Sequence, residues 1–469
     1  MIRSNTSIGM LWLFIVLLLC VCGCTVGPNY KRPDVNVPGQ YRGLPPGTSA
    51  QAAAETFAEM KLAAVFPDEV LQGLLKEALA NNYDVRIAAT RVVQAGADLG
   101  ITRANQLPSL NLAGGIQNQR TQPFPGNVTT GALAVQASWI LDFWGQYRRA
   151  TEAARANLLA TQYAQGIVRI TLISAVANAY FQLRAFDSQL ETSERTLDAD
   201  KEIVRINTIK FKGGESAITD VLQAQLLQEQ AEAGIISLKQ GIEQTENQIS
   251  ILLARNPGPV LRGLSLTQQP HMPEVPAGLP SSILERRPDV LQSEQSLVAA
   301  NANVGVAKAA FFPQFSLTGA FGVQSTALES FLGGGPTTAA WTLAGQLAQP
   351  LYAGGRIRAN YKLAWAQRDE AELVYKQTVL QALGDVSSGL VGYSQSRQFR
   401  MKLEEQTATY KEAARLADVR FLGGYTAFLE VLVTKQQYFT SEINTDQAWL
   451  TEIQNYVQLY QALGGGWQQ

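Results

Sequence analysis

Residues able to carry catalysis or hold a metal are few in this chain of 469 residues. The one histidine, His271, stands in a proline-rich stretch with no second histidine to complete a metal site or a catalytic triad. The glycines in residues 332–336 lack the Lys-Ser/Thr pair of a phosphate-binding loop, so we interpret them as an outward-facing turn. Glu404 and Glu405 are typical of an ordinary helix surface. The sequence therefore predicts no catalytic residue, no metal site and no enzyme activity.

The cysteines indicate a covalent attachment instead. Cys20, Cys22 and Cys24 end a segment that carries Arg3 and an apolar run over residues 8–21, which is typical of a secretory signal. The run is shorter than the roughly 20 residues of a helical membrane span, so a transmembrane anchor is the less favoured alternative. Cleavage before Cys24 leaves a single thiol, which excludes a disulfide framework.

The sequence Val21-Cys22-Gly23-Cys24 resembles a bacterial lipobox, in which the last cysteine is acylated after cleavage. Thr25 stands where an aspartate commonly retains lipoproteins in the inner membrane, which implies sorting to the outer membrane. We expect a signal peptide over residues 1–23 and a lipid on Cys24 as the only attached group.

The charge balance argues against a nucleic-acid partner. Lys plus Arg number 38 against 39 for Asp plus Glu, so the chain has no basic field to attract phosphates.

The chain contains an internal duplication. Gly213-Gly214 aligns with Gly423-Gly424 at a separation of 423 − 213 = 210 residues, and Pro108 aligns with Pro313 at a separation of 313 − 108 = 205 residues. The difference of five residues falls in the longer second hairpin loop. The alternative is that paired glycines only cap unrelated helices.

This repeat gives the expected boundaries. The signal at 1–23 is followed by an N-terminal extended segment and equatorial region at 24–67. The first repeat covers 68–265, with a β-hairpin at about 107–141. A proline-rich link at 266–280 leads to the second repeat at 281–469, with a hairpin at about 312–351.

The two hairpins show the period-two alternation of strands that cross a membrane. One face carries large apolar residues and the other carries small uncharged ones. A soluble β-sandwich would alternate in the same way, but two isolated hairpins are too few strands for one. Aromatic residues near the strand ends next to the helices suggest a girdle at a membrane interface: Trp139, Phe143, Trp144, Phe311, Phe312, Trp341 and Tyr352.

Four strands cannot close a barrel, and an open edge in lipid leaves backbone groups unpaired. Closure therefore requires other copies of the chain. Two copies would give eight strands and a filled barrel, whereas three would give twelve strands and a passage.

Two very long helices are expected, from Tyr147 to about Lys212 and from Ile357 to about Leu422, each about 100 Å long. Neither contains proline. Apolar residues spaced three and four apart in the following helices indicate coiled-coil packing: Ile235, Leu238, Ile242, Thr245, Ile249 and Leu252, and again Leu450, Ile453, Val457 and Tyr460.

From Cys24 onward the chain resembles the outer-membrane factor family of TolC and OprM channels, closest to its efflux lipoprotein (NodT-type) branch. The resemblance rests on residues 24–33, on the Arg286-Arg287-Pro288-Asp289 string, on Pro313 and on residues 420–432. It implies an α+β membrane protein: a homotrimer with a 12-stranded outer-membrane β-barrel continued by a long α-helical periplasmic barrel.

The resemblance also implies a passive exit duct for drugs or other small molecules. An inner-membrane RND transporter and a periplasmic adaptor would deliver the cargo, and the adaptor would dock at the turns formed by Gly213, Gly214, Gly423 and Gly424. The outlet of a type I protein-secretion system and a non-conducting, periplasm-spanning lipoprotein remain as alternatives. Export of metal ions is less favoured because the chain has only five Met and one His.

A periplasmic gate is expected after the second glycine turn, where similar channels close with rings of apolar and acidic residues. Leu429 matches the apolar ring, but Val433 stands where the family has an aspartate. Glu430 and its repeat partner Asp220 (220 + 210 = 430) are the nearest carboxylates, with Arg420 available to offset their charge. The alternative is that both carboxylates only favour the first turn of their helices.

Overall fold

A computed structural model describes residues 25–38, 65–120, 128–269, 286–325, 333 and 337–465. The signal peptide, Cys24 and His271 lie outside the described residues. The chain forms two compact units. The strand unit contains residues 1–34, 90–162 and 292–376, and the helical unit contains residues 35–89, 163–291 and 377–469. Each unit takes residues from both repeats, and each is described by itself below.

The helices and strands confirm the duplication. The two longest helices have 67 residues each, the two that follow them have 35 each, and the two that precede the hairpins have 22 each. The order is α4 (Glu69–Asn81), α5 (Tyr83–Ala104), β1 (Ser109–Gln119), β2 (Val128–Leu141), α6 (Gln146–Lys212), α7 (Ile218–Leu252), η1 (Leu266–Gln268), α9 (Pro288–Ala309), β3 (Gln314–Ser325), β4 (Thr338–Ala348), α11 (Arg356–Leu422) and α12 (Phe428–Ala462). The offset between repeats is 288 − 83 = 205 residues before the hairpin loop and 356 − 146 = 210 after it. The five-residue slip therefore lies in the second hairpin, as expected.

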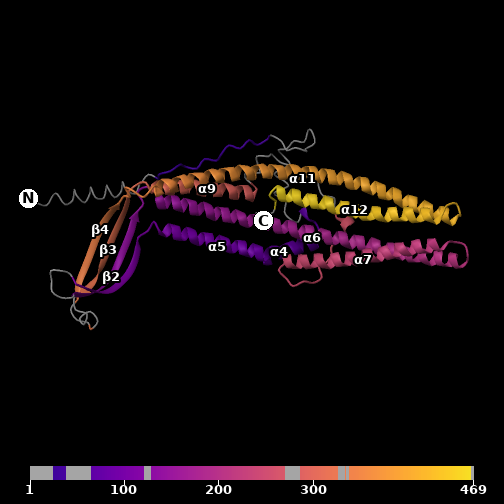
Figure 1. Cartoon of the computed structure of the whole chain (residues 1–469), viewed down its shortest axis with the longest axis horizontal. Coiled ribbons are helices and arrows are strands. Elements are labelled where there is room, and N and C mark those ends of the chain that lie inside the picture. Colours follow the sequence, from indigo (N-terminus) through magenta and orange to yellow (C-terminus); the bar gives the residue numbers. More distant parts are fainter. Residues whose placement is uncertain are drawn as a thin grey trace, which may run out of the picture. The chain divides into compact units, whose positions relative to one another are not determined.

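The strand unit is built on one antiparallel sheet with the order β1-β2-β3-β4 (Figure 1). Leu112 pairs with Val135, Val135 with Phe321, and Phe321 with Trp341. Directly paired residues point to the same face of a sheet, so large apolar side chains from all four strands share one face. Leu112, Phe321 and Trp341 are each about 70% exposed in the single chain, at 72%, 68% and 73%. The predicted strand faces are confirmed.

Most of the expected aromatic girdle lies at the helix-proximal ends of the strands. Phe143 meets Phe315 edge to face at 4.9 Å between ring centroids, and Trp144 stacks on Phe312 at 4.7 Å. The placement of Trp341 in this girdle is wrong. Trp341 pairs with Phe321 and lies seven residues before the end of β4 at Ala348, because β4 enters the sheet from the hairpin loop.

The N-terminal residues of the strand unit are held against α6 and α9. Arg32 donates two hydrogen bonds to the carboxylate of Glu294, at 2.7 and 2.6 Å, and the Tyr30 hydroxyl donates to the same group at 3.0 Å. Arg149 on α6 donates to Asn29 at 2.7 Å. Gly27 has a φ of +107°, and a Cβ there would lie 2.5 Å from the Cα of Gly305. We call residues 25–32 the N-terminal clamp.

Two helical hairpins make up most of the helical unit: the later part of α6 with α7, and the later part of α11 with α12 (Figure 1). Ile249 in α7 and Leu450, Ile453 and Val457 in α12 are at most 1% exposed, which confirms that the three-and-four spacing marks buried seams. The hydroxyl of Thr407 on α11 lies 2.8 Å from that of Thr445 on α12.

Asp68, the N-cap of α4, joins separate parts of the helical unit. Its carboxylate accepts hydrogen bonds from the Val70 amide at 2.9 Å, the Tyr180 hydroxyl at 2.7 Å and the Leu264 amide at 3.0 Å. Burial opposes ionisation of this carboxyl, but the hydrogen bonds from Tyr180, Gln269 and the first turn of α4 outweigh it and lower its pKa. The chain up to Gln269, at the start of the link between the repeats, is thereby fixed to the core of the helical unit.

Candidate functional site

The backbone of the two glycine turns is the same in both repeats. Gly214 and Gly424 have φ values of +77° and +76°, a left-handed conformation that glycine adopts without a steric cost. The amide of Glu215 donates to the Lys210 carbonyl at 2.9 Å, and the amide of Tyr425 donates to the Arg420 carbonyl at 2.9 Å. These are Schellman-type helix ends, so each pair of glycines stops one long helix and starts the return helix.

An ion pair closes the second turn. Arg420, in the last turn of α11, donates from Nη1 to Oε1 of Glu430 in the first turn of α12 at 2.9 Å. The hydroxyl of Thr426 donates to the other carboxylate oxygen of Glu430. Both charged side chains are partly exposed, at 56% for Arg420 and 39% for Glu430. This contact makes the carboxylate a link between the two helices.

The first turn lacks this ion pair. Lys210 occupies the position of Arg420 (420 − 210 = 210), and its amine lies 4.3 Å from the centroid of the Phe421 ring instead of pairing with Asp220. Ser216, the counterpart of Thr426, has a buried hydroxyl with no hydrogen-bond partner among the described residues. Asp220 is one methylene shorter than Glu430, and its side chain forms no hydrogen bond or ion pair within the described part of the chain.

Leu429 and Val433 lie four residues apart on α12 and therefore share one face of that helix. They are 57% and 44% exposed in the single chain. The structure thus brings Arg420 together with Glu430, and Leu429 together with Val433. It does not bring Asp220 to either pair.

Lys210 and Thr426 were missed by the sequence reasoning. Applying the repeat offset of 210 to Arg420 would have found Lys210, because the duplication carries every residue of one turn onto the other. Thr426 carries no local signal, since it stands one residue before the N-cap Ala427 and outside the three-residue spacing of a capping box. No such rule would have placed Lys210 on Phe421, which belongs to the other repeat.

The turns hold no arrangement for bond-making chemistry. Within the described residues, no group of three or more His, Cys, Asp and Glu side chains converges where a metal could bind. The contacts found here are ion pairs, hydrogen bonds and exposed apolar faces, which can hold helix ends together or release them.

Comparison with known proteins places these features in context. Residues 74–255 and 279–465 match the family described as "Outer membrane efflux protein". The chain is 33% identical over 460 residues to the "Solvent efflux pump outer membrane protein SrpC" of Pseudomonas putida, covering 96% of this chain and 97% of that protein. It is 31% identical over 455 residues to the "Cation efflux system protein CusC" of Escherichia coli, covering 96% and 97%.

A solved structure has the same fold. The open state of the Neisseria gonorrhoeae MtrE outer membrane channel superposes with a TM-score of 0.84 and 29% identity, covering 94% of this chain and 98% of that one. The match spans the hairpins and the long helices together, so the strand unit and the helical unit each have a counterpart in that channel.

Proposed function

The chain belongs to the outer membrane efflux protein family, and we propose that it is the passive exit duct of a tripartite pump for drugs or other small organic molecules. The family resemblance read from the sequence is confirmed. The chain is an outer-membrane efflux channel protein, and its family is one of ducts, not of enzymes.

The four-stranded sheet carries this proposal. Its apolar face suits lipid, and within the described residues β1 and β4 each pair with one strand only, so two edges need partners. Three copies supply 3 × 4 = 12 strands, enough for a barrel with a passage. We therefore assign a homotrimer, in which the helical barrel is formed by α6, α7, α11 and α12 of each copy.

The partners follow from the same assignment. A passive duct needs a transporter to supply energy and an adaptor to connect the two. The exposed turns at Gly213-Gly214 and Gly423-Gly424 are the proposed docking points of the periplasmic adaptor, and an inner-membrane RND transporter would load the duct. The relatives differ in cargo, since one is named for solvents and another for cations. The low count of Met and His favours organic cargo for this chain.

A conductance measurement on the purified full-length protein tests the duct. Native mass spectrometry should give three chains per particle, and the particle should form ion-conducting channels in planar bilayers. In cells, deletion of the gene should raise sensitivity to organic toxicants and re-expression should restore resistance. A monomer, or a trimer that never conducts, would contradict the proposal.

We also propose that Cys24 carries the lipid anchor. Thr25, the residue after Cys24, packs closely against Gly145, where a Cβ would lie 2.8 Å from the Thr25 side chain. The N-terminal clamp therefore begins directly after the residue proposed to carry the lipid. Cys24→Ala should abolish incorporation of labelled palmitate. Because the barrel is itself embedded in the membrane, the variant should assemble more slowly but remain in the outer membrane. Equal labelling of the variant and the natural chain would rule out the anchor.

A further inference from the structure

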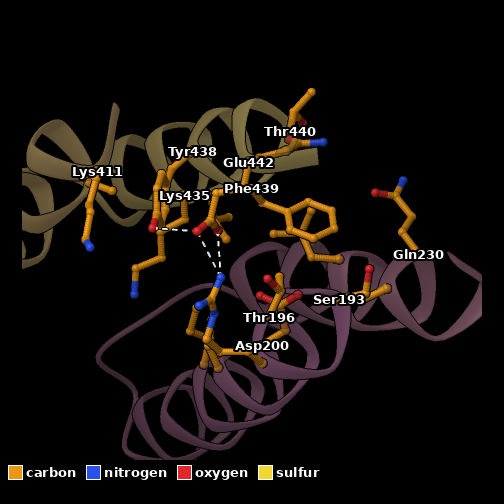
Figure 2. A pocket seen from close by; sticks show the side chains of 18 of the residues that line it. Ser193, Thr196, Asp200, Gln230, Lys411, Lys435, Tyr438, Phe439, Thr440 and Glu442 are labelled. Carbon is orange, nitrogen blue, oxygen red and sulfur yellow. Dashed lines mark hydrogen bonds and ion pairs between the residues drawn. The ribbon is translucent and has the colours of Figure 1, made fainter. Parts of the chain in front are cut away.

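A cavity of about 450 Å³ lies in the helical unit between the two helical hairpins (Figure 2). Residues of α6, α7, α11 and α12 all line it. The walls are largely apolar, with contributions from Ile203, Leu227, Ala231, Leu432 and Phe439. A cavity of this volume and lining is typical of sites that hold small organic molecules.

Asp200 on α6 lines this cavity and is only 8% exposed, yet it accepts no hydrogen bond from any residue in the described part of the chain. The neighbouring hydroxyls of Ser193 and Thr196 are engaged elsewhere. They donate to backbone carbonyls of α6 at 2.7 and 2.9 Å. Burial raises the pKa of Asp200 to about 6, against the opposing charge of Lys435. The carboxylate is mostly desolvated and receives no hydrogen bond from the described chain, so both of its oxygens are available to a ligand in the cavity.

Almost every other charge in the lining is already neutralised. The carboxylate of Glu442 accepts from Arg195 at 2.9 Å and from the Tyr438 hydroxyl at 2.8 Å, as the dashed lines in Figure 2 show. Asp418 pairs with Lys435 at 2.9 Å.

Two cations of the lining remain. Arg415 pairs with Glu412, which lies outside the cavity, at 2.7 Å, and Lys411 is exposed to solvent. Among the described lining residues, Asp200 is therefore the one buried charge whose hydrogen-bonding capacity is unused.

We propose that this cavity binds a small organic cation, with its ammonium group donating to Asp200 and its apolar body against Ile203, Leu227 and Phe439. An ammonium–carboxylate hydrogen bond is charge-assisted and strong in a poorly hydrated cavity. A hard metal ion fits less well, because it needs several oxygen ligands and the unpaired carboxylate supplies at most two. The proposal goes beyond the duct function, which requires no binding site in the channel wall.

Dansylcadaverine is a suitable probe, because it joins a primary ammonium group to an aromatic body whose fluorescence rises in apolar surroundings. The titration uses the full-length assembled protein in lipid nanodiscs at pH 7.5. N-pentyl dansylamide, which lacks the amine, is the matched neutral ligand and reports simple partitioning into lipid. Saturable binding of the amine, about tenfold or more tighter than that of the neutral ligand, is the expected result.

Variants then locate the site. Asp200→Asn keeps the side-chain shape and should weaken binding of the amine about tenfold or more. Asp198→Asn, at an 81% exposed carboxylate two residues away on the same helix, should leave binding unchanged. Gly234 lines the cavity and has open space around its Cβ position, so Gly234→Leu is sterically allowed and should weaken binding by occupying part of the cavity.

A pH series adds a second readout. Between pH 7.5 and pH 5 the carboxyl of Asp200 takes up a proton, so the natural protein should lose affinity for the amine while Asp200→Asn should not. Equal affinity of the amine for Asp200→Asn and the natural protein, both assembled, would overturn the proposal. So would equal binding of the neutral ligand. Neither result would contradict the proposed function as a conducting duct.

Discussion

The two glycine turns have the same backbone and different side-chain chemistry. Both end a 67-residue helix with a glycine at a φ near +76°, and both begin a 35-residue helix six residues after the long one ends. Only the second turn ties its two helices together with an ion pair, between Arg420 and Glu430. Both repeats need the same reversal of the chain, so the backbone conformation is the same in the two turns. The side chains are not needed for that reversal and differ between the repeats.

We propose that the expected gate uses the two turns differently. In this proposal the second turn, with Glu430 linked to Arg420 and Leu429 exposed, holds the closed end. The first turn, with Asp220 unpaired among the described residues and Lys210 lying over Phe421, has fewer contacts of its own to lose. The following predictions test that division.

The largest effect is expected from Leu429→Ala combined with Glu430→Ala. The change removes the apolar face and the ion pair together, so resting conductance should rise by more than tenfold and large antibiotics should enter the cell. The matched variant in the first repeat is Thr219→Ala with Asp220→Ala, which should change conductance little. Unchanged conductance of the first variant, with normal trimer levels, would remove the gate assignment.

Glu430→Gln alone should have a smaller effect. An exposed ion pair is worth about 0.5 kcal/mol, so its loss in three copies shifts the balance between closed and open channels by roughly tenfold. Asp220→Asn is the control and should have no measurable effect. Raising salt to about 1 M should open the natural channel and leave Glu430→Gln unaffected, because salt screens exposed charges. Equal responses of the two variants would show that the turns are equivalent.

A weaker effect, of opposite sign, is expected when the ion pair is built into the first turn. Lys210→Arg with Asp220→Glu reproduces the two ion-pairing residues of the second turn and should lower resting conductance. The coupling between the two changes, measured by a double-mutant cycle on thermal unfolding, should be about 0.2–1 kcal/mol. Zero coupling would mean that the Phe421 ring holds the residue at position 210 more strongly than a carboxylate can.

The smallest difference is expected between Gly214→Ala and Gly424→Ala. Both glycines have positive φ, and no heavy atom lies within 4 Å of either Cβ position, so only backbone strain is added. Each change should destabilise its turn by about 1–2 kcal/mol, with no difference between the repeats. Unequal unfolding temperatures would show that the turns differ in backbone as well as in side chains.

The features that the sequence predicted well are those set by local rules. The helices α6 and α11 begin within one residue of the expected starts at Tyr147 and Ile357, because a glycine and the change from strand to helix pattern mark these boundaries. The strand faces follow from period two. The placement of Trp341 in the girdle is the exception, because β4 enters the sheet from the hairpin loop and Trp341 lies in the half of the strand nearer that loop.

The remaining features depend on helix pairing that local patterns do not encode. The contact between Lys210 and Phe421 joins residues 421 − 210 = 211 positions apart, in different repeats. In the sequence Asp200 resembles any helix-surface carboxylate, and only the packing of the helices around the cavity buries it. Its burial depends on which faces of four helices meet, and this geometry is fixed by the packing of many apolar side chains together.

The N-terminal clamp has a consequence for how the protein sits in the bilayer. With Cys24 acylated, the fatty acids would start one residue, about 3.8 Å, from Thr25, which packs against Gly145 at the start of α6. Gly27 packs closely against Gly305, and Arg32 is hydrogen-bonded to Glu294. The segment between the lipid and the strand unit is therefore held in place and has little freedom to move. The acyl chains would therefore fix the position of the strands along the membrane normal, relative to the inner leaflet. They would resist displacement of the sheet towards the periplasm when a pump exerts force on the duct.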